Sequence, residues 1–161
     1  LKQRQKINVY ADRETKKYLY QSFKYCFNDN IGYPSIMNLY KLKNLHKYKN
    51  LKIESFPVEH GAVNSSLYLF NKKCAYASDV SSIKKKYFKK LKNLKYFIVD
   101  CLRYNFHPTH FNLDNVLKLL KKISPKKTIL TNLSNEIDYN EIKKLLPKNV
   151  IPAHDGLTIS V

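Results

Sequence analysis

Histidine and aspartate side chains stand at the ends of apolar runs in this sequence, and these residue types bind divalent metal ions or transfer protons. The residues are His60, Asp79 and the pair His107 and His110. Side chains at the ends of buried strands are where α/β proteins usually place their chemistry. If these strand ends converge, the sequence predicts a metal site or an acid–base site.

Each motif also has a purely structural explanation. His60 precedes a glycine, whose small size would let a metal or a ligand approach, but a histidine before a glycine often only completes a turn. Asp79 could serve as the cap of the helix that follows it. His107 and His110 flank a Pro-Thr pair whose proline restricts the loop. A bare His-x-x-His pair has low specificity, because a metal site needs further ligands at a defined geometry.

The run at residues 96–102 must position the His-Pro-Thr-His loop. It is short, aromatic and β-branched, which predicts a buried strand. A helix is expected directly after the loop, because Asn112 can cap it. Its apolar face repeats at helical spacing, at Leu113, Val116, Leu117 and Leu120.

The other segments predict an α/β protein with a layered arrangement. Polar turns are expected at 46–50 and 71–73, and helix caps at Asp12, at Ser81 or Ser82, and at Asp138. The remaining expected strands are 7–11, 36–45, 51–58, 67–70, 74–77, 128–131, 150–151 and 157–161. Strands dominate the first half and β-α-β units the second, so we expect a layered α/β sandwich rather than a helical bundle.

The chain of 161 residues has a formal net charge of +18, which invites a nucleic-acid hypothesis. Nearly all of its basic residues are lysines, because Arg4, Arg13 and Arg103 are the only arginines. Dedicated readers of phosphates and bases rely on the planar arginine fork. The charge therefore favours a solvated surface, and we do not expect nucleic acid to be a partner.

The cysteines indicate a reducing compartment. Cys26, Cys74 and Cys101 are odd in number and lie in apolar stretches without a Cys-x-x-Cys motif. This pattern predicts reduced thiols in a cytoplasmic protein rather than disulfides or a zinc knuckle. No apolar run approaches the roughly 20 residues that span a bilayer, so a membrane partner is not expected.

The motifs occur in the order VEHG, YASDV, VDCLRYNFHPTHFNLD, ILTNLSNEIDY and LPKNVIPAHDGLTISV. This order resembles the metallo-β-lactamase-fold hydrolases, and most of all the branch with the phosphoribosyl cyclic phosphate phosphodiesterases. The resemblance covers nearly the whole chain. It implies an αββα sandwich and a phosphodiesterase that acts on a small, plausibly cyclic, phosphate ester. A homodimer is an open expectation.

The resemblance also implies two divalent ions, zinc or manganese, which would activate water and neutralise phosphate charge. His60 matches a terminal metal ligand, Asp79 the carboxylate that bridges the two ions, and His110 a general acid for the leaving group. Further candidates for contact with the substrate or for support of the ligands are His107, Asn132, Asn135 and Asp155. For Asp155, which precedes Gly156, a tight turn is the favoured interpretation.

Two departures from the family pattern bear on activity. The signature His-x-His-x-Asp-His is absent, and the chain does not begin with methionine. Residues 1–161 are therefore expected to be roughly the C-terminal two-thirds of the domain, without its upstream segment. The turn at 131–135 also lacks the family's metal-binding histidine. We expect this chain alone to bind metal weakly and to be inactive. A non-catalytic binding or structural module and an RNA-processing nuclease of the same fold are the alternatives.

Overall fold

The computed structural model describes residues 5–161, which form two compact units divided after Asn44. Strands and helices both contribute, so the protein belongs to the α/β class as predicted. Among the described helices, none has the length and apolar character required to cross a membrane.

The first unit contains two parallel strands, β1 (Ile7–Ala11) and β2 (Met37–Lys41), connected by α1 (Arg13–Ser22) and α2 (Lys24–Phe27). The predicted cap at Asp12 is present, since its carboxylate accepts hydrogen bonds from the backbone N–H groups of Glu14 and Thr15. Apolar residues recur at helical spacing after this cap, at Leu19, Phe23, Cys26 and Phe27, which predicts one continuous helix. The structure has two, because Phe23 leaves the helical conformation with φ −126° and ψ 36°.

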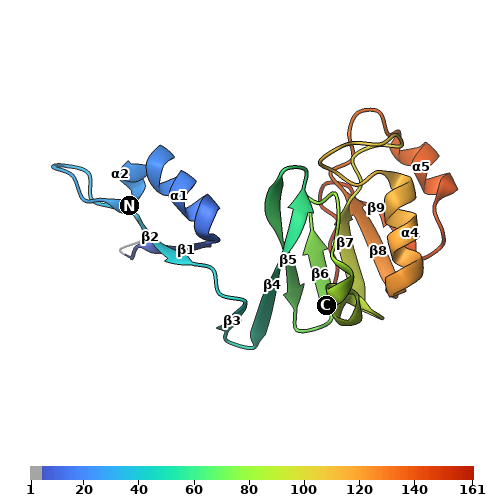
Figure 1. Cartoon of the computed structure of the whole chain (residues 1–161), viewed down its shortest axis with the longest axis horizontal. Coiled ribbons are helices and arrows are strands. Elements are labelled where there is room, and N and C mark those ends of the chain that lie inside the picture. The colour runs from blue at the N-terminus through green and yellow to red at the C-terminus, as the bar shows by residue number, and fades with distance from the viewer. Residues whose placement is uncertain (1–4) are drawn as a thin grey trace. The chain divides into compact units, whose positions relative to one another are not determined.

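The second unit, Leu45–Val161, is built on a seven-stranded sheet in the order β3-β4-β5-β6-β7-β8-β9 (Figure 1). Strands β3 to β6 pair antiparallel, and β6 to β9 pair parallel. The strands are β3 (Leu45–Tyr48), β4 (Leu51–His60), β5 (Val63–Phe70), β6 (Cys74–Ala77), β7 (Tyr96–Asp100), β8 (Lys127–Thr131) and β9 (Val150–Pro152).

Short and long helices pack onto this sheet. They are η1 (Lys85–Tyr87), α3 (Phe88–Leu91), α4 (Leu113–Ile123) and α5 (Tyr139–Leu145). Helix α4 begins as predicted, because the Asn112 side chain accepts a hydrogen bond from the Asn115 N–H at 3.0 Å. Its apolar face enters the core with Val116 and Ile123, both fully buried, and meets Phe97 and Val99 of β7 in one hydrophobic cluster.

The strand directions explain why distant segments meet. Strand β5 is antiparallel to both β4 and β6, so β4 and β6 run in the same direction. Strands β7 and β8 continue that direction, because the β6–β7 and β7–β8 pairs are parallel. The carboxyl ends of β4, β6, β7 and β8 therefore lie along a single edge of the sheet, as parallel pairing requires.

Some sequence expectations were wrong in detail. Residues 36–45 do not form a hairpin with 51–58: β2 pairs with β1, and His46 lies in the separate strand β3 rather than in a turn. Neither Ser81 nor Ser82 caps a helix, because η1 has no side-chain cap. The Ser81 hydroxyl instead donates to the Glu59 carbonyl at 3.2 Å. Residues 157–161 alternate in burial like a strand but pair with no described strand.

Candidate metal centre

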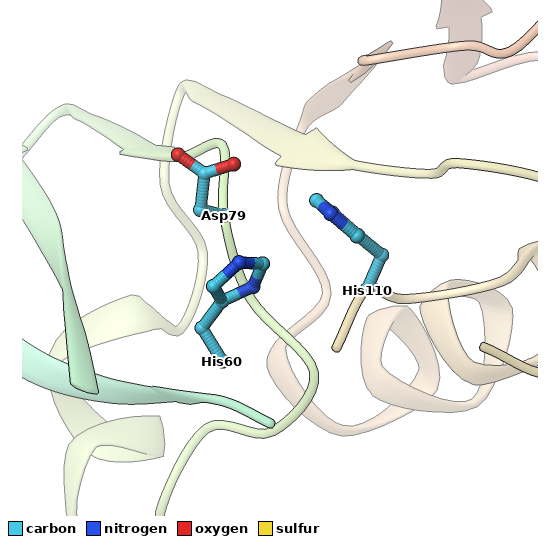
Figure 2. Close-up of side chains that lie close together, drawn as sticks. All are labelled: His60, Asp79 and His110. Carbon is cyan, nitrogen blue, oxygen red and sulfur yellow. The ribbon is translucent and has the colours of Figure 1, made fainter. Parts of the chain in front are cut away.

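His60, Asp79 and His110 come together at the carboxyl edge of the sheet, and their side chains point toward one another (Figure 2). One ligand atom from each residue lies within 4.8 Å of the others. His60 ends β4, Asp79 follows β6, and His110 lies in the loop between β7 and α4. The clustering predicted from the sequence is therefore present, while the roles of the three residues stay predictions.

The orientation of His60 is set by the backbone of the loop that carries His110. The Nδ1 atom of His60 lies 2.6 Å from the Thr109 carbonyl oxygen. A carbonyl can only accept, so Nδ1 carries the proton and Nε2 keeps its lone pair. The loop approaches closely because residue 61 is glycine: a Cβ at Gly61, where φ is +60°, would lie 2.6 Å from the Thr109 methyl group.

His110 is oriented by Asp100, a residue that the sequence reading did not assign. Asp100 ends β7 and is fully buried, and its Oδ2 lies 2.5 Å from His110 Nδ1. The same oxygen accepts a hydrogen bond from the Val80 N–H at 3.2 Å. The carboxylate favours the proton on Nδ1 of His110 and leaves Nε2 available to the site.

Burial disfavours the charged form of Asp100 and raises the pKa of its carboxyl group to about 6. Hydrogen bonds from His110 and Val80 counteract this rise in pKa, and the charge of Asp79 adds to it. The other oxygen, Oδ1, is buried without a hydrogen-bond partner in the described structure. A buried charge that is only partly satisfied usually serves a function. Here Asp100 orients the imidazole of His110 beside His60 and Asp79.

Asp79 is exposed, and its segment is held from a neighbouring strand end. The Asn132 side chain, directly after β8, donates its Nδ2–H to the Ser78 carbonyl at 2.7 Å. Asn132 has a φ of +60°, a conformation that asparagine tolerates better than most residues. Its described contact therefore supports the turn that carries Asp79.

The other predicted residues differ in how near they lie to the three-residue group. His107 is close to it, with its ring centroid 5.2 Å from that of His110. Asn135 and Asp155 are exposed, and Asp155 does not belong to the one group of His, Cys, Asp and Glu side chains that could hold a metal among residues 5–161. Cys26, Cys74 and Cys101 are buried and free, as predicted.

The donor set fits a divalent ion such as zinc. Two imidazoles and a carboxylate are ordinary zinc ligands, and each imidazole donates its Nδ1–H to an oxygen while Nε2 stays free. Histidine ligands of metals almost always have such an outer partner, because it fixes the tautomer and the ring orientation. His60 and Asp79 are therefore the residues that would hold the ion, and the His110 imidazole lies directly beside them.

The arrangement defines an α/β domain with a candidate metal centre at the carboxyl edge of its sheet. A family model described as the beta-lactamase superfamily domain matches residues 1–131. The chain belongs to this family. Its fold is the metallo-β-lactamase fold of hydrolases, as the resemblance predicted.

Solved structures agree with this assignment. A new diphosphatase from the PhnP family is 30% identical with a TM-score of 0.85, and the match covers 94% of this chain and 57% of that chain. The metallo-β-lactamase-fold protein YhfI from Bacillus subtilis is 14% identical with a TM-score of 0.74, covering 98% of this chain and 66% of that one. The short form of human tRNase Z is 13% identical with a TM-score of 0.66, covering 98% and 69%.

The chain thus spans 57% of the length of the diphosphatase. The two structures below 15% identity establish the fold alone. No protein with curated function matches the sequence significantly.

Proposed function

We propose that the protein is a metal-dependent phosphodiesterase whose substrate is a small, cyclic phosphate ester. The observation that carries the proposal is the His60, Asp79 and His110 group, with both imidazoles held so that Nε2 faces the site. The similarity to a diphosphatase of the PhnP family supports phosphoester chemistry. Two divalent ions, zinc or manganese, are the proposed cofactors, with Asp79 as the carboxylate shared between them.

Each residue has a distinct task in this proposal. His60 and Asp79 hold metal, and a bound divalent ion supplies a nucleophile at neutral pH and stabilises charge on the phosphoryl group. His110 delivers a proton from Nε2 to the leaving-group oxygen, and Asp100 stabilises the imidazolium that must exist before that transfer. The carboxylate of Asp100 also orients the His110 ring, so that the proton on Nε2 is aligned with the leaving-group oxygen.

The turn after β8 limits metal binding by this chain. It contains Asn132 and Asn135 but no histidine, and the Nδ2–H of Asn132 is used to hold the Ser78 carbonyl. An amide oxygen is also a poor substitute for imidazole at a zinc site. We propose that the remaining ligands come from the upstream His-x-His-x-Asp-His segment that the family carries.

The activity test compares the chain with a completed domain. By itself, the chain should bind zinc weakly and leave an aryl phosphodiester intact, because too few ligands remain to hold two ions. A fusion to an upstream segment that carries His-x-His-x-Asp-His should show metal-dependent hydrolysis. The readout is release of p-nitrophenol from bis(p-nitrophenyl) phosphate with and without a chelator.

Two outcomes would contradict this assignment. Hydrolysis of the phosphodiester by residues 1–161 alone would show that the ligands in this chain suffice for activity. A correctly folded fusion that binds zinc but hydrolyses no phosphodiester or diphosphate would favour the other candidate, a non-catalytic binding module. The absence of a histidine from the turn at 131–135 is the observation that favours that candidate.

The charge of +18 leads to a prediction about nucleic acid. If the lysines form only a solvated surface, RNA binding should be weak and non-selective and should fall steeply with salt, because counterion release would supply nearly all of it. Filter binding from low salt to ~150 mM measures this dependence. Tight binding of one RNA structure at the upper end would instead support a nuclease of this fold.

The proposed location is the cytoplasm, because three buried, free thiols suit a reducing compartment. A small phosphate ester is the proposed partner. The homodimer stays a prediction, which light scattering would test.

A further inference from the structure

His107 lies beside the candidate metal centre but outside its group of potential ligands. The ring centroids of His107 and His110 are 5.2 Å apart, and those of His110 and His60 are 4.7 Å apart. The His110 ring therefore lies beside both of the other imidazoles. A substrate held at the candidate centre would lie within reach of His107.

Thr109 fixes His107 and His60 at the same time. The backbone N–H of Thr109 lies 3.3 Å from His107 Nδ1, and its hydroxyl oxygen lies 3.2 Å from that atom. A backbone N–H can only donate, so Nδ1 of His107 accepts and the proton of the neutral ring sits on Nε2. The carbonyl of the same residue accepts from His60 Nδ1, which gives His60 the opposite tautomer.

Hydrogen bonds and an ion pair hold the loop that carries His107. Arg103 donates from Nη2 to the Phe106 carbonyl at 2.8 Å, and its Nη1 lies 3.7 Å from a carboxylate oxygen of Glu136. Asn112 donates from Nδ2 to the Tyr104 carbonyl at 3.1 Å. His107 is half-buried, whereas its neighbour Phe106 is 70% exposed. The imidazole is thus held in one orientation before any substrate arrives.

We propose that His107 is a substrate-binding residue whose Nε2–H donates a hydrogen bond to a phosphoryl oxygen of the substrate. This inference rests on the proposed function for the identity of the substrate. A fixed N–H donor next to a metal centre suits an oxygen anion, because hydrogen bonds to charged acceptors are stronger than those to neutral ones. The two histidines have opposite tautomers and therefore different roles: Nε2 of His60 offers a lone pair to the metal, and Nε2 of His107 offers a proton to the anion.

The first test reads the tautomer directly. In protein labelled with ¹⁵N-histidine, long-range ¹H–¹⁵N correlation spectra should show His107 protonated on Nε2 and His60 protonated on Nδ1. Addition of phenylphosphonate, which carries a phosphoryl anion but no hydrolysable ester, should shift the Nε2 resonance of His107. An Nδ1-protonated His107, or an unperturbed resonance at ligand saturation, would overturn the inference.

The second test measures phenylphosphonate affinity at saturating Zn²⁺ by calorimetry. His107→Phe keeps a ring but removes the donor, so binding should weaken about tenfold or more, the value of one hydrogen bond to a charged group. His107→Gln places an amide N–H near the same position and should recover most of the affinity. His46→Phe, in β3 opposite Ile53 near the amino end of β4, is the matched control and should bind like the parent protein.

The outcomes separate this inference from the proposed function. Equal affinities of the parent and His107→Phe proteins, or no phenylphosphonate binding by the zinc-saturated parent, overturn the role of His107. The zinc affinity of the parent and of His107→Phe should be the same. A zinc affinity that does not depend on Asp79 would overturn the proposed metal centre, whatever the result at His107.

Discussion

Replacement of Asp79 by asparagine is expected to abolish measurable zinc binding by this protein. The carboxylate is the only anionic group among the three potential ligands, and its ligand atom lies within 4.8 Å of those of His60 and His110. Asparagine keeps the shape of the side chain but removes the charge, so it offers a divalent ion a much weaker oxygen. Loss of a mere outer partner of a ligand lowers metal affinity by about 10- to 100-fold. Loss of a ligand itself should exceed that range.

Calorimetric titration with Zn²⁺ provides the measurement, and Asp114→Asn provides the control. Asp114 is an exposed carboxylate in the first turn of α4, where it pairs with Lys118 at 2.6 Å. The control therefore makes the same change in charge without touching the candidate centre. Equal zinc affinity of the Asp79→Asn and Asp114→Asn proteins would show that the ion binds elsewhere, and the assignment would fail.

The sequence predicted the residues of the centre because chain direction determines where strand ends lie. His60, Asp79 and His110 each follow an apolar run, and parallel strands bring such positions to one edge of a sheet. Which strands pair is less accessible from sequence. Residues 36–45 were expected to form one strand joined to 51–58 by a polar turn, yet β2 pairs with β1, a choice that depends on contacts between distant segments.

Asp100 was missed although the sequence carries a signal for it. It is the only charged residue in the run 96–102, and a charge in a buried strand requires a partner. The contributions of Thr109 could not be predicted in this way. Its carbonyl accepts from His60 and its N–H donates to His107. Every residue type offers these two backbone groups, except that proline has no N–H, so the residue type at 109 does not reveal them. Only the path of the loop shows which residue supplies them.

The strand expected at 157–161 failed for a different reason. Alternating half-buried and exposed side chains are typical of a strand, and Leu157 and Ile159 follow that alternation. A strand also needs backbone pairing, and no described strand accepts this segment. One hydrogen bond to the segment comes from a side chain far away in the sequence: Lys95 Nζ donates to the Ser160 carbonyl at 2.9 Å.

Asp100→Asn is expected to remove a large pH dependence from the stability of the metal-free protein. Burial raises the pKa of the Asp100 carboxyl group from 3.8 to about 6. A raised pKa in the folded state means that the protonated group favours folding, fully so below pH 3.8. That contribution is lost as the pH rises through about 6, because the carboxylate must then be ionised in a buried site. At 1.36 kcal/mol per unit of pKa, the loss is about 3 kcal/mol between pH 4 and pH 8.

The asparagine variant cannot ionise, so the difference in unfolding free energy between it and the parent should shift in its favour by about 3 kcal/mol over that pH range. Urea unfolding in the presence of a chelator, followed by the methyl resonances of Val99 and Leu130, reports on the unit that contains Asp100. Asp114→Asn should follow the pH curve of the parent, since that carboxylate is exposed. Parallel curves for the parent and Asp100→Asn would mean that the Asp100 carboxyl titrates alike in the folded and unfolded chains. The hydrogen bonds from His110 and Val80 would then offset the cost of burial in full, and the raised pKa of Asp100 would be wrong.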